Sequence, residues 1–264
     1  MLIDGARSAF DLNRDYNEEL LAVRTAKAAN RSDDELREVI RGVAGIRKLE
    51  DIPAVRAGDV MERQYNGRST AAGTSIFTTD SFAYSAEDGK VLLPARRYSL
   101  NIPSTGTVIY LNDKGGATGA ERIKELAQAG KTVVAVDLRG LGQTQGVGAT
   151  YYNHDLFGTD GVDYYFAYLL GRSYVGMRTE DLLAVAKAQE SKSVEIVADG
   201  EVAGLVALHA AALEPALIKG VTLDAPIRTW YDFVKSGSTP YPITNIVHGA
   251  LLEYDVPDLQ RLVK

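Results

Sequence analysis

The spacing of hydrophobic and polar positions changes near residue 74, and this change divides the chain into two parts. Over residues 15–44 the apolar positions follow a helical period, and Ser32 and Glu35 form a capping-box pattern that opens a second helix. The apolar positions are Leu20, Leu21 and Val23 in the first helix, and Leu36, Val39, Ile40 and Val43 in the second. We therefore predict an N-terminal helical hairpin, followed by a connector over residues 51–73 that is rich in proline and glycine.

From residue 74 onward, short apolar runs alternate with helical patterns. Strands are predicted at residues 74–84, 91–100, 107–111, 132–137 and 218–223, and helices at residues 119–129, 161–170, 179–190, 230–234, 243–252 and 256–263. An Asp-Gly turn at residues 87–89 indicates a hairpin between the first two strands. Because strands that are apolar throughout need cover on both faces, the pattern predicts an α/β fold with a doubly wound, mostly parallel sheet. The expected division is residues 1–73 as N-terminal segment and 74–264 as α/β domain.

Composition and charge limit the classes of partner. The net charge of -6 disfavours nucleic-acid binding, and the chain has no cysteine for disulfides or thiolate chemistry. No run of about 18 apolar residues is present, so no membrane span is expected. The start lacks the pattern of a signal peptide. We expect a cytoplasmic protein if Met1 is the true start, and a secreted or periplasmic one if the parent protein is longer.

Residues 193–213 form the most informative segment of the sequence. A short apolar strand, a tight turn and a helix of small residues follow one another there, as they do in the G-x-S-x-G nucleophile elbow. Glu201 then falls at the nucleophile position, with Asp199 and Ala203 at the positions of small residues. A register one residue later places Val202 there instead. Neither register supplies a hydroxyl or a thiol.

With this elbow, the sequence resembles the α/β-hydrolase superfamily, and within it the acetyl-xylan-esterase and dienelactone-hydrolase-like branch. The segments that carry the resemblance are the elbow, the loop at residues 112–116, the Asp-Leu-Arg-Gly-Leu-Gly turn at residues 137–142, and residues 170–178 and 254–259. The resemblance implies oxyanion-hole donors in the loop after the third strand of the hydrolase order and after the nucleophile. The candidate positions are Asn112, Asp113 and Val202.

The remaining members of a catalytic triad do not take their expected places. In this family the acid and the histidine follow later strands, so the chain as given implies a C-terminally incomplete hydrolase fold. The three histidines are His154, His209 and His248. We predict that His209 is a packed helix residue and that His248 has a core or surface role. A sheet that ends at residues 218–223 is expected to expose an unpaired strand edge and to favour association.

These observations favour an esterase-like domain that is catalytically inactive as given, a fragment or degenerate module of a larger carbohydrate-esterase-like protein. One alternative is an active carboxylic-ester hydrolase that uses Ser173 or Ser236. Another is a carbohydrate- or protein-binding module that uses the tyrosine-rich residues 151–174. No cofactor and no metal is expected. The expected partners are a carbohydrate ester or glycan, or another domain of the same polypeptide.

Overall fold

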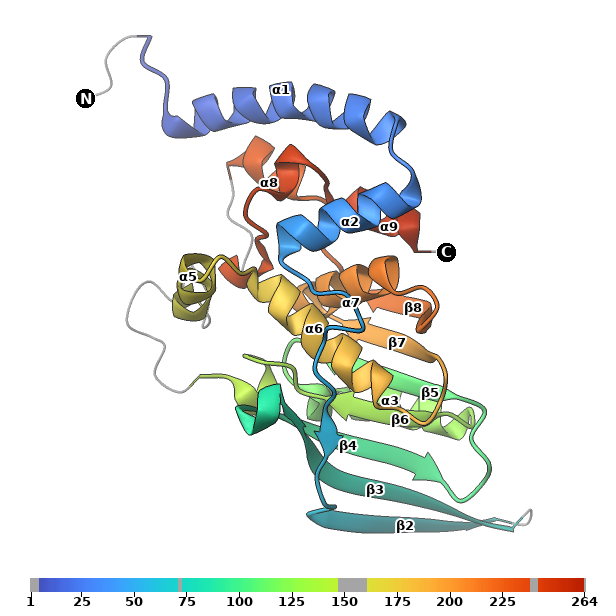
Figure 1. The fold of residues 1–264 in the computed structure, drawn as a ribbon. Coiled ribbons are helices and arrows are strands. Elements are labelled where there is room, and N and C mark those ends of the chain that lie inside the picture. The colour runs from blue at the N-terminus through green and yellow to red at the C-terminus, as the bar shows by residue number, and fades with distance from the viewer. Residues whose placement is uncertain (1–4, 71–72, 147–160, 238–241, 264) are drawn as a thin grey trace.

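The computed structural model describes residues 5–70, 73–146, 161–237 and 242–263 (Figure 1). Two helices come first, α1 (Ala9–Ala29) and α2 (Asp33–Ala44). Ser8 and Ser32 cap them through capping boxes, of which that at Ser32 was predicted. Leu36 and Ile40 of α2 are buried as expected.

The fully buried side chains of helix α1 are polar, whereas Leu20 and Leu21 of the predicted apolar stripe are only partly buried. Its buried residues are Asn17 and Arg24, whereas Val23 is exposed. The Asn17 side chain donates to the Tyr231 carbonyl at 3.2 Å, and the Arg24 side chain donates to the Leu251 carbonyl at 2.7 Å. The polar face of α1 therefore points inward, because backbone carbonyls on the surface below it accept these hydrogen bonds.

In the part of the chain that the structure describes, an eight-stranded mixed sheet forms the centre, in the order β1-β3-β4-β6-β5-β7-β8, with β2 paired to β3. Its strands are β1 (Arg56–Ala57), β2 (Glu62–Thr70), β3 (Gly73–Ala86), β4 (Val91–Leu100), β5 (Thr107–Asn112), β6 (Thr132–Val136), β7 (Val194–Asp199) and β8 (Ile218–Asp224). The neighbours among β6, β5, β7 and β8 are parallel, and those among β1 to β4 are antiparallel. Strand β4 joins the two parts by antiparallel pairing with β6.

Helices cover both faces of the sheet, which confirms the predicted fold class. The helices after α2 are α3 (Ala120–Gln128), α5 (Gly161–Leu169), α6 (Tyr174–Lys187), α7 (Glu201–Leu213), α8 (Trp230–Ser236) and α9 (Val256–Leu262). Along β5, Val108 and Tyr110 join the core beneath α3, and Ile109 and Leu111 join the larger core with α2, α6 and α7. The side chains of one strand thus alternate between two cores.

Two predicted segments differ from the structure. Residues 51–73, expected as a connector, contain β1 and β2, and β2 pairs with β3 along its length. The described residues of β2 are exposed and lack an apolar alternation, so hydrophobic spacing does not mark this edge strand. The division at residue 73 stays a prediction. Residues 243–252, expected as one helix, form two short 3-10 turns, because Gly249 between them has a left-handed φ of 76°.

Helix α6 begins at Tyr174, five residues before its predicted start, because Ser173 caps it through its hydroxyl. Among the described residues, none of the helices combines the length and the apolar character that a membrane-spanning segment needs.

Candidate functional site

The carboxyl ends of β5 and β7 bring the predicted site residues together. The two strands are parallel neighbours, and Asn112 lies opposite Asp199 in their register. Beyond this pair, the Asp113 amide donates to the Asp199 carbonyl at 3.1 Å. Strand β7 continues through Gly200 into α7, which begins at Glu201. Ligand sites of open α/β sheets lie at this edge.

The side chain of Asp113 caps the N-terminus of α7. Its Oδ2 accepts from the Val202 amide at 3.1 Å, and its Oδ1 accepts from the Ala203 amide at 2.7 Å. Gly200 leaves room for this approach, because a Cβ there would overlap the Asp113 carboxyl group. The amide of Val202, predicted as an oxyanion donor, is therefore occupied by another predicted residue of the same site.

The turn before α7 differs from a nucleophile elbow, because a glycine before the nucleophile position, and not the residue at that position, has a positive φ. Gly200 has a φ of 113°, whereas Glu201 is the first residue of the helix. Among the described residues, only Glu87 and Ala225 combine a positive φ with a side chain. In an active elbow the nucleophile itself lies on the strained turn. Glu201 is thus at the predicted position but without the conformation of a nucleophile.

Two carboxyl groups meet at this turn, and burial raises the pKa of both. Burial raises the pKa of Asp113, and the hydrogen bonds from the Ala203 and Val202 amides act against that rise. Burial also raises the pKa of Glu201, and the charge of Asp113 adds to this rise. The site is therefore acidic, and it disfavours a further negative charge.

Asn112 does not point at the α7 N-terminus. Its Nδ2 donates to Asp199 Oδ2 at 2.7 Å and to the Tyr110 hydroxyl oxygen at 3.2 Å, and its Oδ1 accepts from the Lys114 amide at 2.8 Å. These bonds hold the loop after β5 in place. Of the predicted oxyanion residues, Asp113 and Val202 are thus brought together. The Asn112 side chain instead stabilises the loop after β5.

Another carboxylate, that of Asp137 directly after β6, holds two loops together. Its Oδ1 accepts from the Gly116 amide at 2.7 Å, and its Oδ2 accepts from the Gln143 amide at 3.0 Å. Gly142 packs directly against this carboxylate, where a Cβ would lie 2.5 Å from Oδ2. The Asp-Leu-Arg-Gly-Leu-Gly turn singled out in the sequence is therefore a structural clamp next to the site.

Arg178 ends the segment at residues 170–178 that supports the resemblance, but its role was not predicted, and the structure buries its side chain completely. It donates to the Arg139 carbonyl at 2.8 Å and to Thr244 Oγ1 at 3.1 Å, and its guanidinium lies 4.5 Å from the centre of the Tyr174 ring. Its charge lowers the pKa of Asp113, a smaller effect than burial. Buried guanidinium groups become visible only when tertiary packing is known.

The described histidines are not placed to act as a general base at this turn. His209 is fully buried on α7, with Nδ1 2.8 Å from the Leu205 carbonyl and Nε2 3.0 Å from the Tyr254 hydroxyl, so it is a packed helix residue as predicted. His248 is exposed, and its ring lies 4.9 Å from that of Tyr168. His154 lies outside the described residues.

The two serines considered as alternative nucleophiles have local structural roles. Ser173 caps α6, where its Oγ accepts from the Gly176 amide at 3.0 Å. Ser236 is exposed near the end of α8, and its hydroxyl donates to the Phe233 carbonyl at 3.2 Å.

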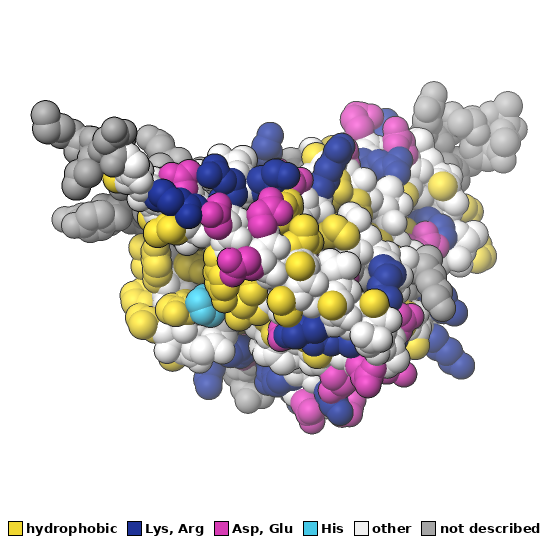
Figure 2. Space-filling model, turned by 90° about the horizontal axis from the view of Figure 1, so that it is seen from above, with side chains coloured by type: hydrophobic (Ala, Val, Ile, Leu, Met, Phe, Trp, Pro, Cys, Tyr) yellow, Lys and Arg dark blue, Asp and Glu magenta, His cyan; other side chains and the backbone are white. Residues whose placement is uncertain are grey.

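The tyrosine-rich segment divides into packed and exposed rings. Tyr174 is buried beneath Arg178, whereas Tyr165 and Tyr168 on α5 are exposed. Figure 2 shows hydrophobic side chains gathered around the exposed histidine, next to which Tyr168 lies. Residues 151 and 152 of the same segment lie outside the described residues.

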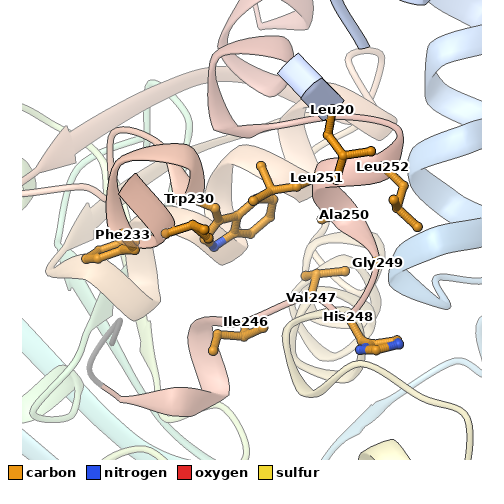
Figure 3. Close-up of a pocket in the computed structure, with 11 residues that line it drawn as sticks. Leu20, Trp230, Phe233, Ile246, Val247, His248, Gly249, Ala250, Leu251 and Leu252 are labelled. Atoms are coloured by element: carbon orange, nitrogen blue, oxygen red, sulfur yellow. The ribbon is translucent and has the colours of Figure 1, made fainter. Parts of the chain in front are cut away.

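An apolar cavity of about 240 Å³ lies beneath α1 (Figure 3). Leu20 contributes from α1, Trp230 and Phe233 from α8, and residues 246–252 complete the wall. None of its lining residues comes from the α7 N-terminus, so this cavity is not the counterpart of a substrate pocket at the elbow.

The strand order and the strand-turn-helix unit define the α/β-hydrolase fold, and comparison with solved structures agrees. A structure from Bacteroides fragilis that is assigned as an acetyl xylan esterase matches with a TM-score of 0.61 and 16% sequence identity, over 87% of this chain and 64% of that chain. Acetyl xylan esterase 1 from Thermoanaerobacterium sp. matches with a TM-score of 0.49 and 19% identity, over 88% of this chain and 75% of that one.

The match with a TM-score of 0.61 shows that the chain has the α/β-hydrolase fold. The chain spans 64% of the length of the Bacteroides protein. No family model and no curated protein matches the sequence.

Proposed function

We propose that this chain is a non-catalytic domain with the fold of an esterase, which acts through binding. The observation that carries the proposal is the Asp113 carboxylate on the Val202 and Ala203 amides. In an active ester hydrolase the amide after the nucleophile stabilises the negative oxygen of the tetrahedral intermediate. A carboxylate in that place occupies the amide, which can then no longer bind the oxyanion. It also repels the negative charge that develops in the transition state.

The groups around the amide support the same conclusion. Glu201 has a long side chain and a partly buried carboxyl group. Burial raises the pKa of this group, so it is a poor nucleophile. Both ring nitrogens of His209 are engaged inside the core. Acyl transfer needs a nucleophile, an oriented base and free oxyanion donors together, and the described residues at this turn supply none of the three.

The proposal is tested with a short-chain acyl ester and a serine-directed fluorophosphonate. We expect turnover of 4-nitrophenyl acetate no faster than with the heat-denatured chain, and no labelled serine in a peptide map. Asp113→Ala frees both amides but adds no nucleophile, so it should stay inactive as well.

Three outcomes would contradict the proposal, and each identifies a different nucleophile. Turnover that disappears in Ser173→Ala or in Ser236→Ala would establish the corresponding serine esterase. Turnover that disappears in Glu201→Gln would establish a carboxylate nucleophile.

The binding partner that we propose is a glycan or another domain of the same polypeptide. Tyr165 and Tyr168 support the first choice, because they are exposed aromatic residues three positions apart on one helix. Retardation in a xylan-containing gel, lost when both tyrosines are replaced by alanine, is the expected result. Unretarded migration of the unmodified chain would remove the glycan from the proposal.

A further inference from the structure

The cavity beneath α1 is built by three parts of the chain that meet around it (Figure 3). Helix α8 supplies Trp230 and Phe233, and residues 246–252 form the rest of the wall. This segment curves because Gly249 has a left-handed φ of 76°, which separates its two 3-10 turns. Leu20 of α1 completes the enclosure and forms the roof.

Two polar contacts hold α1 over the cavity, one on each side of Leu20 along the helix. Asn17 donates to the Tyr231 carbonyl on α8 at 3.2 Å, and Arg24 donates to the Leu251 carbonyl at 2.7 Å. Asn17, Leu20 and Arg24 share one face of the helix, because they follow one another at helical spacing. Hydrogen bonds to the rim therefore set the height of the roof, and space remains beneath Leu20.

The lining has the character of a site for an apolar molecule. Among the described residues that line the cavity, none is Asp, Glu, Lys or Arg. The one polar atom of the Trp230 ring, Nε1, already donates to the Asn245 carbonyl at 3.0 Å, so the ring offers apolar surface. His248 and Leu252 are the exposed lining residues, which places the opening on their side (Figure 3). An occupant can bury an apolar part and keep a polar end at this opening.

The size of the cavity limits what can occupy it. An engineered cavity of about 150 Å³ with a similar lining holds benzene, so in proportion a cavity of about 240 Å³ holds about nine or ten non-hydrogen atoms. This volume is below the range of about 300–1,000 Å³ that is typical of sites for drug-sized ligands. The occupant is therefore a small molecule, and a helix or strand of another protein is too large.

We propose that this cavity binds an aliphatic chain of about eight carbon atoms that carries one polar group. The chain lies beneath the roof, and the polar group lies at the opening beside His248. Most of the side chains around the chain are aliphatic, namely those of Leu20, Ile246, Val247, Leu251 and Leu252. The cavity shares no lining residue with the α7 N-terminus or with the exposed tyrosines of α5, so this proposal does not rest on the proposed function.

Trp230 is the single tryptophan of the chain, so the cavity contains its own fluorescent reporter. Titration of the full chain with 1-octanol should give a saturable change in tryptophan emission, with a dissociation constant of about 0.1–1 mM. Octane-1,8-diol should bind about ten-fold more weakly, since its second hydroxyl would lie in the apolar end without a hydrogen-bond partner. Emission that does not respond to 1-octanol, or equal affinity for the diol, would overturn the proposal.

The dependence on chain length separates the cavity from the exposed apolar side chains around His248 (Figure 2). Within the cavity, binding should strengthen about four-fold for each methylene from 1-pentanol to 1-octanol and then stop increasing, because the space is filled. Adsorption to exposed apolar surface has no such limit. An affinity that continues to rise through 1-decanol and 1-dodecanol would therefore contradict a site inside the cavity.

Ala250→Leu tests the location of the site. Ala250 is buried and lines the cavity, so a larger side chain there takes up part of the space. We expect 1-octanol to bind about ten-fold more weakly, and the gain with chain length to end at shorter alcohols. Ala22→Leu makes the same substitution at an exposed position of α1 and should change neither property. Unchanged binding in a folded Ala250→Leu variant would overturn the proposal.

Leu20→Ala decides the question if Ala250→Leu does not fold. Leu20 is only partly buried, and α1 keeps its contacts through Asn17 and Arg24, so circular dichroism should show an unchanged fold. The variant should bind 1-octanol about five-fold more weakly, because the chain loses its contact with the roof. Val23→Ala, at an exposed position of the same helix, should bind like the unmodified chain. Equal binding by both variants would show that the aliphatic chain does not lie beneath α1.

Discussion

At the scale of single residues, the buried His209 has the clearest consequence for stability. Its ring lies inside the core between the Leu205 carbonyl and the Tyr254 hydroxyl. Burial lowers the pKa of His209 from 6.5 to about 4, although the hydrogen bond to Leu205 acts in the other direction. The folded protein therefore keeps this imidazole neutral under conditions in which the unfolded chain protonates it.

The sign of the pH dependence follows from proton binding. Between pH 6.5 and about 4 the unfolded state binds more protons at this residue than the folded state. The free energy of unfolding should thus fall as the pH is lowered through this window, and His209 should account for about 3 kcal/mol of the loss. Urea unfolding at neutral pH and near pH 4 measures it.

A pair of variants isolates the contribution of His209. His209→Gln should lower stability at neutral pH but lose the histidine-dependent part of the pH effect. His248→Gln, at an exposed position, should keep the pH dependence of the unmodified protein. A pH dependence that is the same in all three proteins would show that His209 is not the group that titrates.

Single residues also mark the limit of prediction from the sequence at this site. The sequence placed Asp113 after a strand and Val202 at a helix start, which follows from apolar runs and small residues. The bond between them depends on the parallel pairing of β5 with β7, and that pairing is a tertiary property. Which of Asn112 and Asp113 turns toward α7 could therefore not be derived from the spacing.

At the scale of elements, α6 and α2 approach each other more closely than a side chain allows. A Cβ at Gly176 would overlap the Ala44 carbonyl oxygen at the end of α2. Gly176→Ala should therefore separate the two helices and lower the free energy of unfolding by about 2–3 kcal/mol. The midpoint of urea unfolding measures this change.

Gly42→Ala is the matched control on α2. A Cβ at Gly42 meets open space, so the substitution should raise the free energy of unfolding by about 0.5–1 kcal/mol through helix propensity alone. If both alanine variants were equally stable, the contact between α6 and α2 would not restrict side-chain size.

The predictability of the elements follows from what stabilises each of them. Strands β5 to β8 and helix α3 carry apolar runs or an amphipathic face, and they were located to within about two residues. Strand β2 is held by backbone pairing with β3, and α1 by polar side chains that reach backbone carbonyls. Neither interaction leaves a hydrophobic period in the sequence.

At the scale of the whole molecule, two hydrophobic cores lie on the two faces of one sheet. The fold class could be predicted from the sequence, because strands that are apolar throughout need helices on both faces of their sheet. The relative order of β6, β5 and β7 requires crossovers that the sequence does not encode locally. Among the described residues, this order places β8 at one end of the sheet.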